Sequence, residues 1–257
     1  MTVWGTMSFM VQTGWTAQRW TAVFVEQAEM FRKAVAEADP TAEVPTRPGW
    51  TVQDLVVHLA RFLETSTEYL RTGSRTQLEP PPPPAGLSPL EYLDLQLTAA
   101  AEILAAVPGN RPVWTFSPAA PDLAWVWHRR IAHETVLRRF DAQTVVRQVA
   151  GTDPGLCVDG VDEVLTTIVA AKTEGDVPNI APGTAVVRTT DVPESWLISL
   201  TPDEAPEIRA AAPGEEGDAQ VTGEAELVYF WLWNRMNLKE MTGDRRVLDV
   251  LQVGRGH

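Results

Sequence analysis

Residues 127–141 read WHRRIAHETVLRRFD, and this stretch decides how the N-terminal half of the chain is expected to fold. Its apolar and charged side chains recur every three or four residues, which is the spacing of one stripe along a helix. That stripe consists of Trp127, Ile131, Glu134, Arg138, Asp141 and Val145. Because it begins with Trp and Ile and ends with Val, the stripe is expected to face inward. Glu134, Arg138 and Asp141 would then lie inside or at the mouth of a helical bundle.

Three further helices are predicted before this one. The four predicted helices cover about residues 16–38, 51–71, 88–107 and 121–149. The second begins at Thr51, which has Asp54 three residues later, as in a capping box. The third begins with a Ser cap at Ser88 and a proline at the first helical position. Four helices of about five to seven turns predict a bundle with its core between facing stripes.

Two connecting segments have distinct compositions. Residues 72–86 include an unbroken proline run at 80–84, which predicts a semi-rigid surface connector. A proline-rich binding motif is the alternative interpretation of that run. Residues 110–120 include Trp114 and Phe116 and are expected to fold over one end of the bundle.

The pattern changes after Gly151. A helix is predicted over 158–171, and another after Gly223. Between them, short alternating runs at 184–188, 196–200, 207–209 and 219–222 are typical of half-buried antiparallel strands. The second half is therefore predicted as α+β, a small antiparallel sheet with helices on one side. The expected domains are a four-helix bundle at 1–150 and a small α+β domain at 151–257.

Composition narrows the classes of partner. The 257 residues carry a formal net charge of -13, which argues against a nucleic-acid or anionic membrane partner. The chain has one cysteine, Cys157, which rules out an internal disulfide, suits a reducing cytoplasm and is assigned to packing. The first 15 residues show neither a signal peptide nor a membrane span and are interpreted as a disordered lead-in or a start-site extension. We expect a monomer or homodimer that acts on a small molecule.

Buried charge raises the question of function. An inward carboxylate or guanidinium is costly unless it is paired or bound to a metal. His58 lies among the apolar positions of the second helix, so two separate stripes place polar groups toward one core. One interpretation is a satisfied ion pair with a hydrogen-bonded histidine. The other is a functional site between the two helices.

Several motifs together resemble one known family. They are GWTVQDLVVHL at 49–59, WTF at 114–116, RIAHE at 130–134 followed by Asp141-Ala142, and, in the second half, Gly183-Thr184, Trp233-Asn234-Arg235 and Gly243-Asp244. They are similar to the mycothiol-dependent maleylpyruvate isomerase family of the DinB-like metalloenzyme superfamily, from about Trp15 to Leu251. The resemblance implies a DinB-like four-helix bundle followed by a small α/β domain of the sterol-carrier type.

The resemblance also implies a chemistry. A divalent metal, usually zinc, is held in that family by a His on the second helix and by a Glu and a His one turn apart on the fourth. The metal acidifies the thiol of mycothiol, which then attacks a small electrophilic metabolite. Position by position, His58 and Glu134 match the first two ligands, and the third falls on Arg138. A guanidinium has no lone pair to offer and repels a cation.

Other groups offer only partial replacements for the missing ligand. His133 and His128 lie off the stripe, and a water molecule would complete a two-ligand site beside the Arg138 charge. The tryptophans Trp50, Trp114 and Trp127 indicate either an apolar or planar ligand or plain core packing.

Three functions therefore stay open. The first is a thiol-dependent isomerase or transferase that uses mycothiol and zinc, with His58, Glu134 and Arg138 as the catalytic candidates. The second is a metal-free enzyme or binding protein in which Arg138 replaces the metal charge, binds an anion, and leaves proton transfer to His58. The third is a regulator that binds a protein partner.

Overall fold

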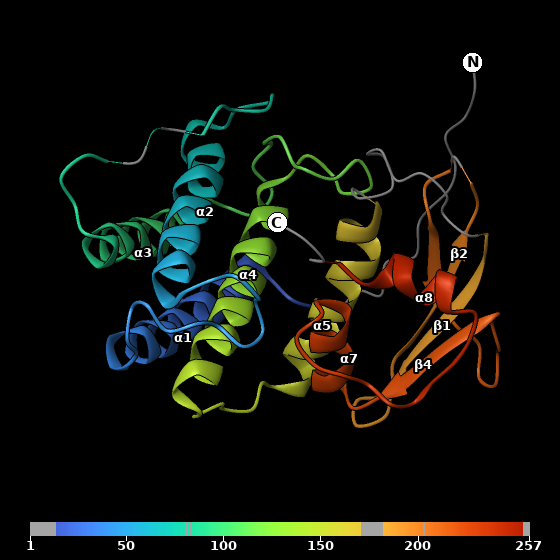
Figure 1. Cartoon of the computed structure of the whole chain (residues 1–257). Coiled ribbons are helices and arrows are strands. Elements are labelled where there is room, and N and C mark those ends of the chain that lie inside the picture. The colour runs from blue at the N-terminus through green and yellow to red at the C-terminus, as the bar shows by residue number, and fades with distance from the viewer. Residues whose placement is uncertain (1–13, 81, 83, 171–181, 203, 254–257) are drawn as a thin grey trace, which may run out of the picture. The chain divides into compact units, whose positions relative to one another are not determined.

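The computed structural model describes residues 14–80, 82, 84–170, 182–202 and 204–253 (Figure 1). These residues divide into two compact units, one of Trp15–Phe116 with Ala120–Gly151 and the other of Ser117–Ala119 with the chain from Thr152 onward. The lead-in predicted over the first 15 residues falls almost entirely outside the described part of the chain.

The first unit is a four-helix bundle, as predicted. Its helices are α1 (Ala17–Glu37), α2 (Val52–Thr72), α3 (Pro89–Ala106) and α4 (Ala124–Val146). The expected capping box at Thr51 is present: the Thr51 side chain accepts from the Asp54 amide and the Asp54 side chain accepts from the Thr51 amide. Ser88 caps α3 in the same way. Helix α4 is shorter than predicted, because the left-handed Arg147 (φ 56°) ends it.

Helix α4 is buried on every side and not only along one stripe. All residues from Val126 to Gln143 are buried, and both α1 and α2 pack against the helix. Charged side chains off the predicted stripe are therefore buried as well, and they need partners. Arg139, for example, donates from Nε to Gln27 Oε1 over 3.0 Å and from Nη1 to the Ala150 carbonyl over 2.6 Å.

The segment at 110–116 packs at the end of α2, which confirms the expectation for this part of the connector. The Trp114 amide donates to the Ser74 carbonyl over 2.7 Å. Its ring stacks on Tyr69, with centroids 4.9 Å apart, and Tyr69 in turn stacks on Trp127 at 5.0 Å. Trp114 and Trp127 are thus parts of an aromatic stack in the bundle.

The second unit combines helices with a five-stranded sheet. Its helices are α5 (Pro154–Glu163), which continues as the π-helix η1 (Val164–Ile168), α7 (Ala225–Leu232) and α8 (Arg245–Leu251). Its strands are β1 (Gly183–Thr189), β2 (Ser195–Leu200), β3 (Glu207–Ala210), β4 (Ala219–Gly223) and β5 (Met241–Gly243). The order in the sheet is β3-β2-β1-β4-β5. The predicted fold class, a helical bundle followed by a small α/β domain, is confirmed.

The prediction of a purely antiparallel sheet was wrong at its centre. Strands β1 and β4 pair in parallel, with Ala185 opposite Ala219. After β3 the chain returns past β2 and β1 and adds β4 along the other edge of β1. Strand β4 then runs in the same direction as β1. The first helix of this unit also begins earlier than predicted, because Asp153 caps it at the Leu156 amide.

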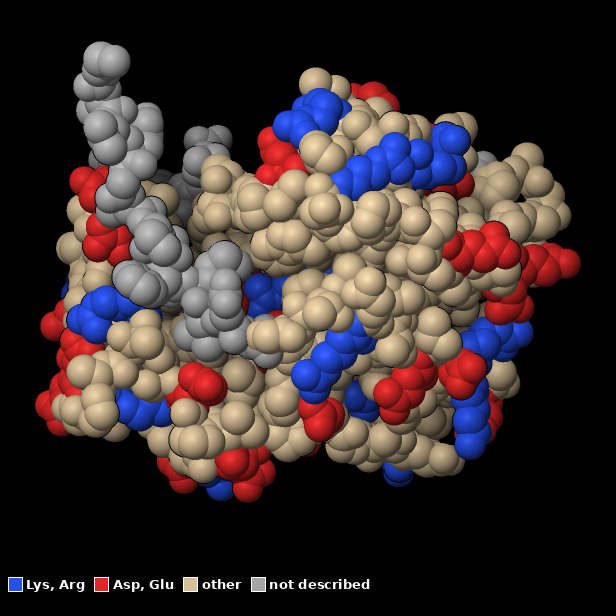
Figure 2. Space-filling model, turned by 180° about the vertical axis from the view of Figure 1, so that it is seen from behind, with Lys and Arg blue, Asp and Glu red and all other residues tan. Residues whose placement is uncertain are grey.

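Helices α5, α7 and α8 lie on one side of this sheet, as predicted (Figure 1). The indole Nε1 of Trp196 on β2 donates to Asp162 Oδ1 of α5 over 3.1 Å, and α7 and α8 both contact β4. Cys157 of α5 is completely buried, in agreement with a packing role. No helix in the described ranges is long and apolar enough to cross a membrane. On the face shown in Figure 2, acidic and basic side chains are interspersed.

Gly160→Ala should destabilise the second unit. Helix α5 passes so close to α7 at this point that a methyl group on Gly160 would overlap the Tyr229 ring. Overpacking of this kind costs roughly 1–3 kcal/mol, which urea denaturation followed by circular dichroism would measure. Gly151→Ala is the matched control, because a methyl group there meets nothing within 4 Å. Equal stability of the two variants would contradict the close packing of α5 on α7.

Candidate functional site

His58 and Glu134, predicted on separate helices, meet inside the bundle unit. The Nε2 atom of His58 on α2 lies 2.9 Å from Oε1 of Glu134 on α4. The His58 side chain is 38% exposed, whereas that of Glu134 is 8% exposed. The pair therefore has a buried carboxylate and an imidazole that a small molecule can reach.

Two arginines on α4 bind the same carboxylate. Arg138 donates from Nε to Glu134 Oε1, and Arg130 donates from Nη2 to Oε2, both over 2.8 Å. Arg138 also donates from Nη1 to Asp141 Oδ2 over 2.8 Å. These residues are three or four positions apart, so one helix presents them to each other. Two guanidinium groups and two carboxylates, all nearly inaccessible to solvent, therefore face one another as ion pairs.

This network keeps Glu134 ionised. Burial acts to raise the pKa of Glu134, but the charge of Arg138, the hydrogen bond from His58 and the charge of Arg130 outweigh it. The pKa of Glu134 is consequently held well below its usual value. An ionised carboxylate only accepts hydrogen bonds, so the Nε2 atom of His58 carries the proton in this contact.

The loop before α2 closes one side of the site. Thr46 donates from Oγ1 to Asp141 Oδ1 over 2.6 Å. Trp50 places its ring edge-on to His58, with centroids 5.0 Å apart, and the guanidinium carbon of Arg138 lies 5.7 Å from the same ring. Trp50 therefore differs from the two stacked tryptophans, because it contacts the candidate site directly.

Thr46→Val should destabilise the bundle. Valine keeps the shape of threonine but removes the hydroxyl that binds the fully buried Asp141 carboxylate. Loss of a hydrogen bond to a charged group costs roughly 1.5–3 kcal/mol, measurable by urea denaturation. Thr41→Val is the matched control: it removes a hydroxyl bond of the same kind, Thr41 Oγ1 to Asp39 Oδ1 at 2.8 Å, where both residues are exposed. A loss as large in the control would show that burial of Asp141 does not matter.

The two histidines of α4, His128 and His133, do not join the site. Among the described residues, Glu134 is bonded to His58, Arg130 and Arg138, and not to His128 or His133. Both histidines are completely buried. The ring nitrogens of His128 lie 2.9 Å from the Ala124 carbonyl oxygen and 3.2 Å from that of Leu104. Neither histidine therefore stands where a third metal ligand is needed.

The residues present do not fit the divalent metal that the family resemblance implies. In the described ranges, no three His, Cys, Asp or Glu side chains come together as a set of ligands. A carboxylate has about four acceptor positions, and Glu134 already accepts three hydrogen bonds. A cation bound to Oε1 would also be repelled by the Arg138 charge. This repulsion costs roughly 4 kcal/mol for two unit charges 4 Å apart, and about twice that when one of the ions is divalent.

Sequence reasoning missed two residues of this network. Arg130 stands four positions before Glu134, the same spacing that linked Glu134 to Arg138, so that interval was the available signal. Thr46 lies in an irregular loop, and nothing in the sequence pairs it with Asp141. The idea that Arg138 binds a free anion also changes, since Arg138 is already compensated by two carboxylates.

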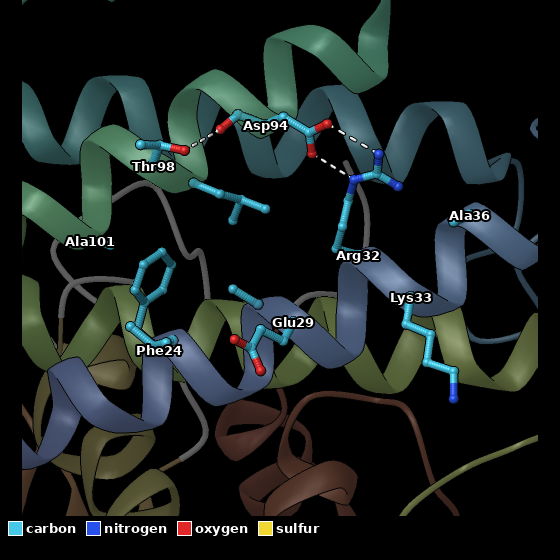
Figure 3. Close-up of a pocket in the computed structure, with 11 residues that line it drawn as sticks. Phe24, Glu29, Arg32, Lys33, Ala36, Asp94, Thr98 and Ala101 are labelled. Atoms are coloured by element: carbon cyan, nitrogen blue, oxygen red, sulfur yellow. Dashed lines mark hydrogen bonds and ion pairs between the residues drawn. The ribbon is translucent and has the colours of Figure 1, made fainter.

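A separate groove lies on the outside of the bundle, between α1 and α3 (Figure 3). It has a volume of about 650 Å³, and its lining shares no residue with the His58 site. Phe24, Ala28 and Leu97 contribute its apolar part. The Arg32 guanidinium binds Asp94 across the groove, with Nε 2.5 Å from Oδ1. The described residues of this lining form no arrangement that is typical of a catalytic site.

Comparisons with known proteins agree for both units. Residues 22–143 match the family model of the mycothiol maleylpyruvate isomerase N-terminal domain, and residues 155–249 match that of the MDMPI C-terminal domain. A crystal structure of the mycothiol-dependent maleylpyruvate isomerase is similar, with a TM-score of 0.58 and 14% identity over 89% of this chain and 94% of the other. The structure of a histidine-to-alanine mutant of such an enzyme has a TM-score of 0.54 and 13% identity, over 84% and 88%. No curated protein matches this chain.

Proposed function

Because this chain belongs to the mycothiol maleylpyruvate isomerase family, we propose that it is a thiol-dependent enzyme that isomerises a small electrophilic metabolite or transfers a thiol to it. Mycothiol is the proposed thiol co-substrate. The observation that carries the proposal is the contact between His58 and Glu134, since it joins the two family motifs at a partly exposed imidazole. A small-molecule substrate, a reducing cytoplasm and a monomer or homodimer complete the proposal.

The proposed roles follow from the direction of the hydrogen bonds. When a neutral His58 donates a hydrogen bond from Nε2 to Glu134, its other ring nitrogen, Nδ1, carries the free lone pair. That nitrogen takes the proton from the thiol, which breaks the S–H bond and forms an N–H bond. The Glu134 carboxylate stabilises the resulting imidazolium, as an ionised partner does for a general base. Arg138 and Arg130 are positioning residues, because they act through Glu134.

The covalent step needs no further reactant. The thiolate sulfur adds to an electrophilic carbon of a conjugated double bond, and the π-electron pair moves to the conjugated carbonyl oxygen. The former double bond then rotates as a single bond. Return of the electron pair expels the thiolate, which regains its proton from His58 and leaves the trans isomer. In a transferase the C–S bond stays, and the carbanionic carbon takes the proton.

The direct test is turnover of the full-length chain with mycothiol and a panel of cis-unsaturated keto acids that begins with maleylpyruvate. Isomer conversion, followed by chromatography, is expected with the thiol and not without it. Formation of a thiol adduct would indicate the transferase. Conversion that does not depend on thiol would overturn the proposal. Saturable binding of an acid with neither isomer nor adduct would favour a binding protein on the same scaffold.

A further inference from the structure

We infer that the positive charge which a divalent metal would supply beside Glu134 is built into this chain as the guanidinium of Arg138, so that the site works without a metal ion. This inference rests on the proposed function, because it concerns how the same site activates its thiol.

The first observation is that Arg138 and His58 share one oxygen atom. Both the Nε2 atom of His58 (2.9 Å) and the Nε atom of Arg138 (2.8 Å) contact Oε1 of Glu134. A cation held between His58 and Glu134 either shares Oε1 with the Arg138 N–H or sits on Oε2 beside the Arg130 N–H, and in both positions it replaces the proton between His58 Nε2 and Oε1. In either case it must break a charge-assisted hydrogen bond that the folded chain already makes.

The second observation is that Arg138 is fixed in place. Its side chain is 4% exposed, and Nη1 is bound to Asp141 over 2.8 Å while Nε is bound to Glu134. Asp141 is itself completely buried and accepts a hydrogen bond from Thr46. An arginine held at two nitrogen atoms does not swing away to admit a cation, since its release would leave two buried carboxylates with fewer partners.

The third observation is the balance of charge. Arg130 and Arg138 pair with Glu134, and Arg138 also pairs with Asp141, all within α4. A divalent ion would add two positive charges to a buried site that already holds two guanidinium groups. Without a metal, Glu134 already has the charges of Arg138 and Arg130 beside it, and His58 is already hydrogen-bonded to the Glu134 carboxylate. The two groups that the proposed proton transfer needs are therefore complete without a metal.

Zinc titration of the full chain tests the inference without an activity assay. Isothermal calorimetry would compare the parent with Arg138→Gln, which removes the charge but adds no ligand, and with Arg138→His, which adds one. Removing a residue that only orients a metal ligand typically weakens metal affinity about 10–100-fold. Arg138→His adds a direct ligand, so it should strengthen zinc affinity by at least that factor. The Arg138→Gln variant should still bind zinc weakly. The double variant H58A/R138H should lose the gain.

The outcomes separate this inference from the proposed function. Tight stoichiometric zinc binding by the parent, lost in His58→Ala, would overturn the inference whether or not turnover is found. Thiol-dependent turnover that a chelator abolishes and zinc restores would overturn the inference but keep the proposed function. Absence of turnover, together with weak zinc binding by the parent, would leave the charge replacement standing and reject the enzyme. Should Arg138→His fail to fold, the titrations of the parent, His58→Ala and Arg138→Gln still decide.

Discussion

Glu134→Gln is expected to lower the free energy of unfolding by about 3–5 kcal/mol, the usual cost of removing one partner from a buried ion pair. Glutamine keeps the size of the side chain but removes the negative charge that lies between Arg130 and Arg138. Both guanidinium groups then stay buried with less compensation. Urea denaturation followed by far-UV circular dichroism would measure the loss.

A surface ion pair provides the control for this variant. Glu68→Gln removes the carboxylate that binds Arg71, whose side chain is 61% exposed. Exposed pairs contribute about 0–1 kcal/mol, so this change should be small. A loss in Glu134→Gln no larger than that in the control would mean that the buried network does not stabilise the bundle.

The same variant makes a prediction about pH. The pKa of Glu134 in the folded chain lies well below its usual value of 4.5. A carboxylate with a depressed pKa contributes stability that is fully present above the unfolded pKa and is lost as the pH falls through the folded pKa. The difference in unfolding free energy between the parent and Glu134→Gln should therefore stay constant from neutral pH to about 4.5 and shrink only below it. A difference that shrinks already near neutral pH would contradict the ionised state assigned to Glu134.

His58→Ala should reduce kcat/KM for the thiol-dependent reaction by about 10²–10⁴-fold, the usual contribution of a general acid or base. The imidazole is the group that takes the thiol proton in the proposed mechanism, and Glu134 alone cannot replace it while it is bound to two arginines. Steady-state kinetics with saturating mycothiol would measure the change. Circular dichroism should show a folded chain, because the His58 side chain is 38% exposed.

Arg32→Gln is the control for His58→Ala. It removes a charged side chain from the outer groove between α1 and α3, where it binds Asp94, and should leave kcat/KM unchanged (Figure 3). A His58→Ala enzyme that keeps more than about a tenth of the parent activity would exclude His58 as the proton acceptor. A large loss in Arg32→Gln would instead move the site to the outer groove.

The helices of the bundle were predictable because their signals are local. The Thr51 and Ser88 caps determine where α2 and α3 begin, and the spacing along α4 predicts the contact of Glu134 with Arg138. The sheet was less predictable, since strand direction depends on which strands become neighbours far apart in the chain. Alternating patterns located β1 and β4 but do not encode that they run in parallel.

The candidate site shows the same limit. His58 and Glu134 could be placed on inward faces from their own helices, and the family motifs joined them. Thr46 could not be found in this way, because its bond to Asp141 depends on the path of an irregular loop. The full burial of α4 was also underestimated, since periodicity reports the apolar stripe and not the charged residues that become buried with their partners.

The parallel pairing at the centre of the sheet has a consequence for how a growing chain reaches its native state. Strands β1, β2 and β3 follow one another and pair through short connections, whereas β4, the other neighbour of β1, comes only after all three. Non-local pairing of this kind is slow, because loop closure must precede it. Until β4 arrives, the inner edge of β1 exposes unpaired backbone groups, and such an edge is a template for wrong partners. During synthesis or heat stress, this edge of β1 is therefore open to aggregation until β4 pairs with it.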